Sequence, residues 1–195
     1  MNDFRKITPK RRSNPAVRNE YRKYKPELRE DFHQRCGYCG DHDFFSVTYY
    51  EVDHFVPKNL DKTKEKDYTN LVYSCRSCNN SKRDKWPTNN SQKPNDGREG
   101  WIDPCDPQYS QQFVRLRDGS IKATTVLGSW IWSALGLGKP NHRVIWKLEE
   151  LKCIFKKIDQ MTSENADLDE LKMINKLNIK YRKLEESLRG VPDFD

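Results

Sequence analysis

Four of the six cysteines stand in two pairs whose spacing is typical of a metal site. The first pair is Cys36 and Cys39, the second is Cys75 and Cys78, and 35 residues separate the two pairs. A two-residue spacing lets both thiolates of a pair reach one tetrahedral ion, and two such pairs complete a four-thiolate zinc site. Four protein ligands leave no open coordination position, so we expect this zinc to be structural and to take no part in chemistry.

The segment between the two cysteine pairs contains a carboxylate next to an imidazole. Asp53 and His54 lie within residues 51–57, near the end of an expected strand. Asn70 precedes the second cysteine pair, and Asn79 follows it directly. An isolated Asp-His dipeptide carries little information, because most surface histidines are simply solvated. Its position inside a strand–loop–helix unit enclosed by two cysteine pairs makes it a candidate catalytic group.

This arrangement resembles the HNH endonuclease family, whose active unit is the ββα-metal fold. The residues that carry the resemblance are, in chain order, Cys36 and Cys39, Asp53-His54 with Pro57, Asn70-Leu71, and Cys75 and Cys78 running into Asn79 and Lys82. The resemblance covers about residues 32–86, under a third of the chain. The last motif position is often His in the family and is Asn79 here, which bears on metal preference more than on activity.

The resemblance implies metal-dependent hydrolysis of DNA phosphodiester bonds, yielding 5′-phosphate and 3′-hydroxyl ends. His54 would be the general base that activates water, because an imidazole pKa near about 6.5 suits proton transfer at neutral pH. Asp53, on the opposite face of the strand, and Asn79, in the first turn of a helix, would hold Mg²⁺ or Mn²⁺. Asn70 would orient the loop that bears His54 without touching the ion.

The formal charge of +7 is unevenly distributed along the chain. Residues 1–30 carry a net +6, residues 31–55 a net −4, residues 56–93 a net +5, and residues 94–195 no net charge. Clustered positive charge indicates a polyanion such as DNA, although a solvated surface explains it equally well. The basic residues expected at phosphates are Lys10, Arg11, Arg12, Lys82, Arg83 and Lys85. For the last three, ordinary solvated helix charge is an equally good interpretation.

The composition excludes several classes of protein. Only 34% of residues are hydrophobic and 33% are charged, and no stretch approaches the roughly 20 apolar residues of a spanning helix, so we expect no membrane segment. No basic and apolar leader is visible, so we expect a cytoplasmic protein, in a compartment where paired cysteines bind metal more often than they form disulfides. Cys105 and Cys153 stand outside the pattern and are interpreted as small buried apolar residues.

The periodicity and turn signals along the chain predict an α+β fold. The expected helices are 26–34, 79–86, 125–137, 143–161 and 167–188, with a strand over 44–56 and a hairpin over 113–124. Apolar residues recur at helical spacing in the last two helices, which look like an antiparallel pair. Ser163 and Glu164 supply capping chemistry ahead of the final helix.

Three regions are expected: a basic, flexible arm over 1–25, an HNH core with zinc over 26–100, and a hairpin plus helical extension over 101–195. Residues 101–107, 123–125 and 135–137 also resemble, more loosely, the C-terminal extension of HNH nucleases of bacterial anti-phage defence systems of the Septu type. That resemblance implies a role as effector and a partner ATPase or sensor protein from the same system.

Two other functions fit part of the sequence. A non-catalytic, zinc-stapled nucleic-acid-binding module explains the cysteines and the basic segments equally well. It gives no reason for Asp53, His54 and Asn79 to stand at nuclease positions. An interaction subunit that another protein recruits to DNA is compatible with a nuclease.

Overall fold

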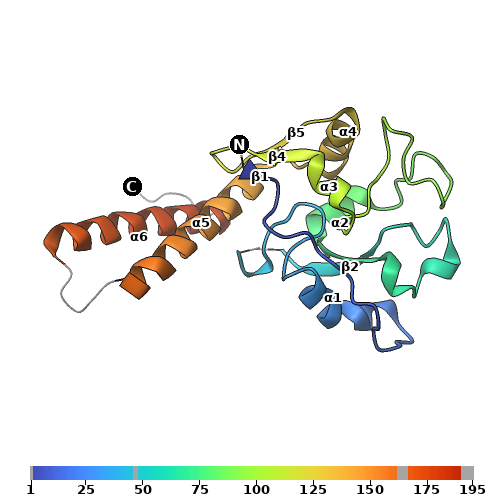
Figure 1. Ribbon diagram of the computed structural model, residues 1–195, viewed down its shortest axis with the longest axis horizontal. Helices are drawn as coiled ribbons and strands as arrows, with labels where there is room; N and C mark the ends of the chain where they lie inside the picture. The colour runs from blue at the N-terminus through green and yellow to red at the C-terminus, as the bar shows by residue number, and fades with distance from the viewer. Residues whose placement is uncertain (1, 46–47, 162–166, 190–195) are drawn as a thin grey trace.

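The computed structural model describes residues 2–45, 48–161 and 167–189, and within them two small antiparallel sheets combine with six α-helices (Figure 1). One sheet has the strand order β1-β4-β5, and the other pairs β2 with β3. The strands are β1 Asn2–Asp3, β2 Tyr50–His54, β3 Leu71–Cys75, β4 Phe113–Arg115 and β5 Ile121–Ala123. The helices are α1 Lys25–Asp31, α2 Arg76–Lys82, α3 Pro107–Gln111, α4 Val126–Leu135, α5 Pro140–Met161 and α6 Leu168–Arg189. This composition agrees with the expected α+β class.

The centre of the molecule is the unit formed by β2, β3 and α2. The two strands pair antiparallel, with Tyr50 opposite Cys75 and His54 opposite Leu71. Every residue of β3 is buried, so this strand lies inside the core. Helix α2 follows β3 without a loop because Cys75 is its N-cap, with the sulfur accepting from Cys78 N at 3.5 Å. The unit therefore brings the end of β2 and the first turns of α2 close together.

The strand expected over 44–56 and the helix expected over 79–86 have different bounds in the structure. The strand expected over 44–56 is shorter, because Asp43–Phe45 forms a 3₁₀ turn and β2 begins only at Tyr50. Phe45 packs in a second small core instead of joining a strand, so tertiary contacts override its strand propensity. The helix expected over 79–86 begins and ends earlier, because the Cys75 cap starts it and Arg83, with φ +44°, ends it.

The N-terminal segment packs against both halves of the chain in the structure, whereas the sequence favoured an arm that orders on a partner. β1 pairs with β4, with Asn2 opposite Arg115, and Phe4 is buried. Arg5 is also buried and donates to Gly37 O at 3.0 Å and to Pro104 O. Only one or two residues at a time are buried along this segment, and they give no apolar periodicity. The sequence pattern therefore does not reveal this packing.

The expected hairpin and the helix after it are present. β4 and β5 pair around the Asp118-Gly119 turn, and Gly119 takes φ +88° there. Thr125 caps α4, its hydroxyl accepting from Gly128 N at 2.8 Å. Gly136, at φ +67°, closes the C-terminal end of the same helix.

Helices α5 and α6 pack against each other and project together away from the rest of the molecule (Figure 1). A small core of Phe45, Ile145, Leu148 and Leu188 joins their base to the sheet-containing part. Asp167 caps α6 through Asp169 N and Glu170 N, whereas the expected caps Ser163 and Glu164 lie outside the described residues. In the part of the chain that the structure describes, no helix is both long and apolar enough to cross a membrane.

Candidate active site and metal centre

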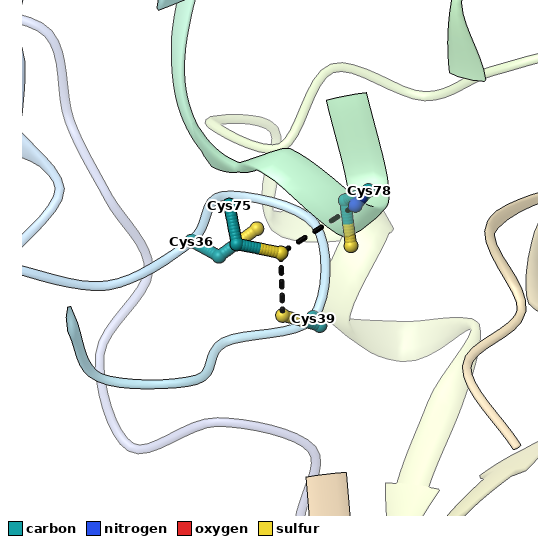
Figure 2. Close-up of side chains that lie close together, drawn as sticks. All are labelled: Cys36, Cys39, Cys75 and Cys78. Carbon is teal, nitrogen blue, oxygen red and sulfur yellow. Dashed lines mark hydrogen bonds between the residues drawn. The ribbon is translucent and has the colours of Figure 1, made fainter. Parts of the chain in front are cut away.

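The two cysteine pairs meet in the core at the junction of β3 and α2. Cys36 and Cys39 come from the turn after α1, Cys75 ends β3, and Cys78 lies in the first turn of α2. All four are buried, and their sulfur atoms lie within 4.8 Å of one another and face a common centre (Figure 2). The Cys39 and Cys75 sulfurs are 3.9 Å apart, close to the about 3.8 Å that a tetrahedral site with zinc–sulfur bonds of about 2.3 Å requires. The donor set and its spacing fit a zinc ion.

Buried arginines hold the loop of the first cysteine pair. Arg5 donates to Gly37 O, and Arg115 Nη2 donates to Cys39 O at 2.9 Å. A Cβ on Gly37 would lie 2.8 Å from a side-chain carbon of Val72, so only glycine fits this approach of the loop to β3. Burial raises the pKa of the Cys39 thiol, and a cation at the centre is what would favour the thiolate form.

His54 stands at the end of β2 with its ring held on two sides. Its Nε2 lies 2.9 Å from Glu65 O, in the loop between β2 and β3. The ring of Tyr21 lies against it, with centroids 4.5 Å apart and planes tilted by 58°. His54 is 9% exposed, so this imidazole is packed in place and is not a freely solvated side chain.

Asn70 ties together the two ends of the loop that follows His54. Its Oδ1 accepts from Val56 N at 2.8 Å, and its Nδ2 donates to Val56 O at 3.0 Å and to Lys64 O at 3.2 Å. Val56 is two residues from His54, and Lys64 precedes Glu65. These bonds fix the loop that carries the hydrogen-bond partner of the imidazole.

One face of β2 lies against α2, and its two carboxylates have different partners. Asn79 Nδ2 donates to Glu51 Oε2 at 2.7 Å. One helical turn further on, the fully buried Lys82 ammonium lies 3.4 Å from Asp53 Oδ2, which also accepts from the Tyr38 hydroxyl at 2.5 Å. Burial raises the pKa of the Asp53 carboxyl, and the Lys82 charge opposes that shift. Asn79 thus contacts Glu51, while the contacts of Asp53 are with Tyr38 and Lys82.

Beside β2, Glu51 and Asn79 open onto a pocket of about 360 Å³. Its lining consists of Tyr21, Arg22, Lys25, Tyr50, Glu51, Val52 and Asn79. A carboxylate and an amide that share one wall supply the oxygen donors that Mg²⁺ and Mn²⁺ prefer, so the residues here fit such an ion. The other carboxylate oxygen of Glu51, Oε1, lies 4.0 Å from Arg76 Nε.

Glu51 is a candidate ligand that the sequence motif does not single out, although the strand pattern points to it. Residues two apart in a strand share a face, so Glu51 must lie on the same side of β2 as Asp53. What the sequence could not supply was the placement of α2 across that face.

The six basic residues expected at phosphates have different surroundings. Those exposed at the surface are Lys10, Arg83 and Lys85. Arg11 makes a salt bridge to Asp103 at 2.9 Å, and Arg12 makes one to Asp31 at 2.9 Å. Lys82 is fully buried and donates to the His54 carbonyl at 2.7 Å, so its ammonium has no surface to offer a phosphate.

Comparison with known proteins identifies one family in this part of the chain. The family model described as HNH endonuclease matches residues 36–85, about a quarter of the chain. The matched segment contains both cysteine pairs, β2, β3, α2, His54 and Asn79. No significant match was found among curated proteins or among solved structures. Residues 36–85 are therefore similar to the HNH endonuclease family. The match ends before residues 101–137, so the resemblance of those residues to defence-system nucleases has no support from the comparisons.

Proposed function

We propose that this protein is a metal-dependent endonuclease that hydrolyses DNA phosphodiester bonds. The observation that carries the proposal is the HNH endonuclease match over residues 36–85, because HNH nucleases act on DNA and are metal-dependent. Within that segment the strand–strand–helix order of β2, β3 and α2 is the order of the ββα-metal unit. The general arrangement therefore supports the same function as the family match.

His54 is the proposed general base. With its Nε2–H donating to Glu65 O, the lone pair of Nδ1 is left to take a proton from water. Asn70 is a positioning residue, because its bonds to Val56 and Lys64 hold the loop that carries Glu65. A fixed tautomer and a fixed ring direction favour proton transfer along one line.

The divalent ion of the proposed reaction would be held by Asn79 together with carboxylate oxygen from β2. Of the two carboxylates, Glu51 is the better candidate ligand, because its side chain is hydrogen-bonded to Asn79 and both residues line the pocket. Asp53 is the ligand predicted from the sequence, and the Lys82 ammonium beside it competes with a second cation. When bound, Mg²⁺ or Mn²⁺ supplies positive charge to the phosphate and to the leaving oxygen.

The four-cysteine cluster is the proposed site of a structural zinc. Its position at the junction of β3 and α2 means that metal binding fixes the start of α2, and hence the position of Asn79. A four-thiolate zinc has no open coordination position and so contributes to folding free energy and not to hydrolysis.

Cleavage of supercoiled plasmid DNA tests this function. Protein freed of loosely bound divalent ions is incubated with plasmid and Mg²⁺, Mn²⁺ or EDTA, and the products are separated on agarose. We expect nicked or linear DNA with Mg²⁺ or Mn²⁺ and none with EDTA, and the nicks should be sealed by DNA ligase because the ends are 5′-phosphate and 3′-hydroxyl. DNA binding without cleavage under either metal would support the non-catalytic binding module instead.

A further inference from the structure

The pocket that Glu51 lines also has lining residues that precede the matched family segment, namely Tyr21, Arg22 and Lys25. The 3₁₀ turn Tyr21–Tyr24 leads directly into α1, and Tyr24 is buried against Tyr68, with ring centroids 5.0 Å apart. The Tyr24 hydroxyl also accepts from Arg18 N at 3.0 Å. This turn is therefore a fixed part of the structure, although it lies outside residues 36–85.

Tyr21 connects this turn to the proposed general base. Its ring centroid lies 4.5 Å from that of His54, with the two ring planes tilted by 58°. Two cations lie near the same aromatic ring, with Lys58 Nζ at 5.8 Å and Arg22 Cζ at 5.5 Å from its centroid. The Glu65 carbonyl holds the edge of the imidazole and Tyr21 restricts its tilt, so the direction of the ring depends on both contacts.

Arg22 and Lys25 bring positive charge to the pocket. Both side chains are exposed and line it with Glu51 and Asn79. Among the described residues, neither has a carboxylate within salt-bridge distance. Other arginines of the N-terminal segment are neutralised, namely Arg11 by Asp103, Arg12 by Glu30 and Asp31, and Arg18 by Glu27. The charge available to a polyanion is therefore found at the pocket, more than in the Lys10-Arg11-Arg12 run.

We propose that the turn at residues 21–25 is part of the nuclease site, with Arg22 and Lys25 binding phosphates next to the scissile one and Tyr21 acting as a positioning residue for His54. This inference rests on the proposed function and adds to it a substrate-binding wall from outside the family segment. Cations that line the same pocket as a metal-binding carboxylate are suited to a phosphodiester backbone, because they neutralise the phosphates that flank the reacting one.

Salt-dependent DNA binding tests the phosphate contacts without requiring cleavage. Fluorescence anisotropy of a labelled duplex is measured in EDTA over a range of NaCl concentrations for wild type and for Arg22→Ala/Lys25→Ala. Each lost phosphate contact lowers the slope of log K against log salt by about 0.9, so the double variant should lose about 2 in slope and bind at least about 10-fold more weakly. Lys23→Ala is the matched control, because Lys23 lies in the same turn, pairs with Glu20 and does not line the pocket.

An unchanged slope in Arg22→Ala/Lys25→Ala, or an equal loss in Lys23→Ala, would overturn the assignment of these phosphate contacts. The measurement is independent of catalysis. If wild type binds DNA but does not cleave it, both the proposed nuclease function and the role of Tyr21 are wrong. The slope of log K against log salt still tests the phosphate contacts in that case.

Cleavage kinetics test Tyr21. We expect Tyr21→Leu to lower kcat at least about 10-fold with little change in KM. Tyr21→Phe should retain wild-type kcat, because the contact with the imidazole is made between the two rings and phenylalanine keeps the ring. Thermal melting of both variants checks that the fold is intact, and leucine keeps enough apolar bulk to fill the position. A wild-type kcat in folded Tyr21→Leu, or an equal loss in Tyr21→Phe, would overturn the positioning role while leaving the proposed function standing.

Discussion

Replacement of Lys82 by methionine should destabilise the protein strongly. The Lys82 side chain is fully buried, its ammonium lies 3.4 Å from Asp53 Oδ2 and 2.7 Å from the His54 carbonyl, and it stands 5.8 Å from the Trp101 ring centroid. Methionine keeps the length and removes the charge, which leaves a buried Asp53 carboxylate without its cation. Removing one member of a buried ion pair costs about 3–5 kcal/mol, or a Tm loss of about 6–20 °C for a chain of this size.

Urea unfolding of wild type, Lys82→Met and Lys85→Met measures the effect. Lys85 is exposed, so its variant should stay within about 0.5 kcal/mol of wild type. The double variant Lys82→Met/Asp53→Asn should recover part of the loss, because no buried charge remains without a partner. If Lys82→Met were as stable as wild type but bound DNA more weakly, Lys82 would be a phosphate ligand. The buried ion pair would then contribute nothing to the free energy of unfolding.

Two further predictions concern the metal sites. In native protein, the exposed Cys153 should react quickly with a thiol reagent at pH 8, and Cys105 should react slowly because burial raises its pKa to about 11. The four cysteines of the cluster should react only after zinc is removed, and the folded signal in circular dichroism should be lost at the same time. Six fast thiols in untreated, folded protein would argue against the zinc site. Glu51→Gln should raise the Mn²⁺ concentration needed for half-maximal cleavage at least about 10-fold, and more than Asp53→Asn does. A larger effect of Asp53→Asn would show that Asp53 is the metal ligand, as the sequence predicts.

The cysteine cluster could be predicted from the sequence because its information is local. Two residues between the members of each pair fix the reach of both thiols, and the structure brings Cys36, Cys39, Cys75 and Cys78 together as expected. The Asp118-Gly119 hairpin and the two long helices were also predictable, since turn chemistry and apolar periodicity are read within a few residues. In contrast, Cys153 is exposed, because α5 projects from the molecule and a lone cysteine says nothing about its helix face.

The partners within the candidate site depend on contacts between distant segments. The pairing of Glu51 with Asn79, and of Asp53 with Lys82, follows from how α2 lies across β2, which no local pattern specifies. The position of Tyr21 against His54 joins residues 33 positions apart through a turn without periodicity. Charge counting has the same limit. About half of the net +6 of residues 1–30 is taken up by acids outside that segment, because Arg11 pairs with Asp103, Arg12 with Asp31 and Arg29 with Asp43, and only the folded structure reveals these pairs.

His54 is the proposed base that activates water in metal-dependent cleavage of DNA. The most direct test of this role is the rate of plasmid cleavage by wild type, His54→Ala and His33→Asn, each with the same zinc content and the same DNA affinity. His33 is exposed and has φ +53°, a conformation that asparagine tolerates, so its variant controls for the loss of a histidine. We expect His54→Ala to lose at least about 100-fold in kcat and His33→Asn to cleave like wild type. Wild-type cleavage by His54→Ala would show that His54 is not the general base.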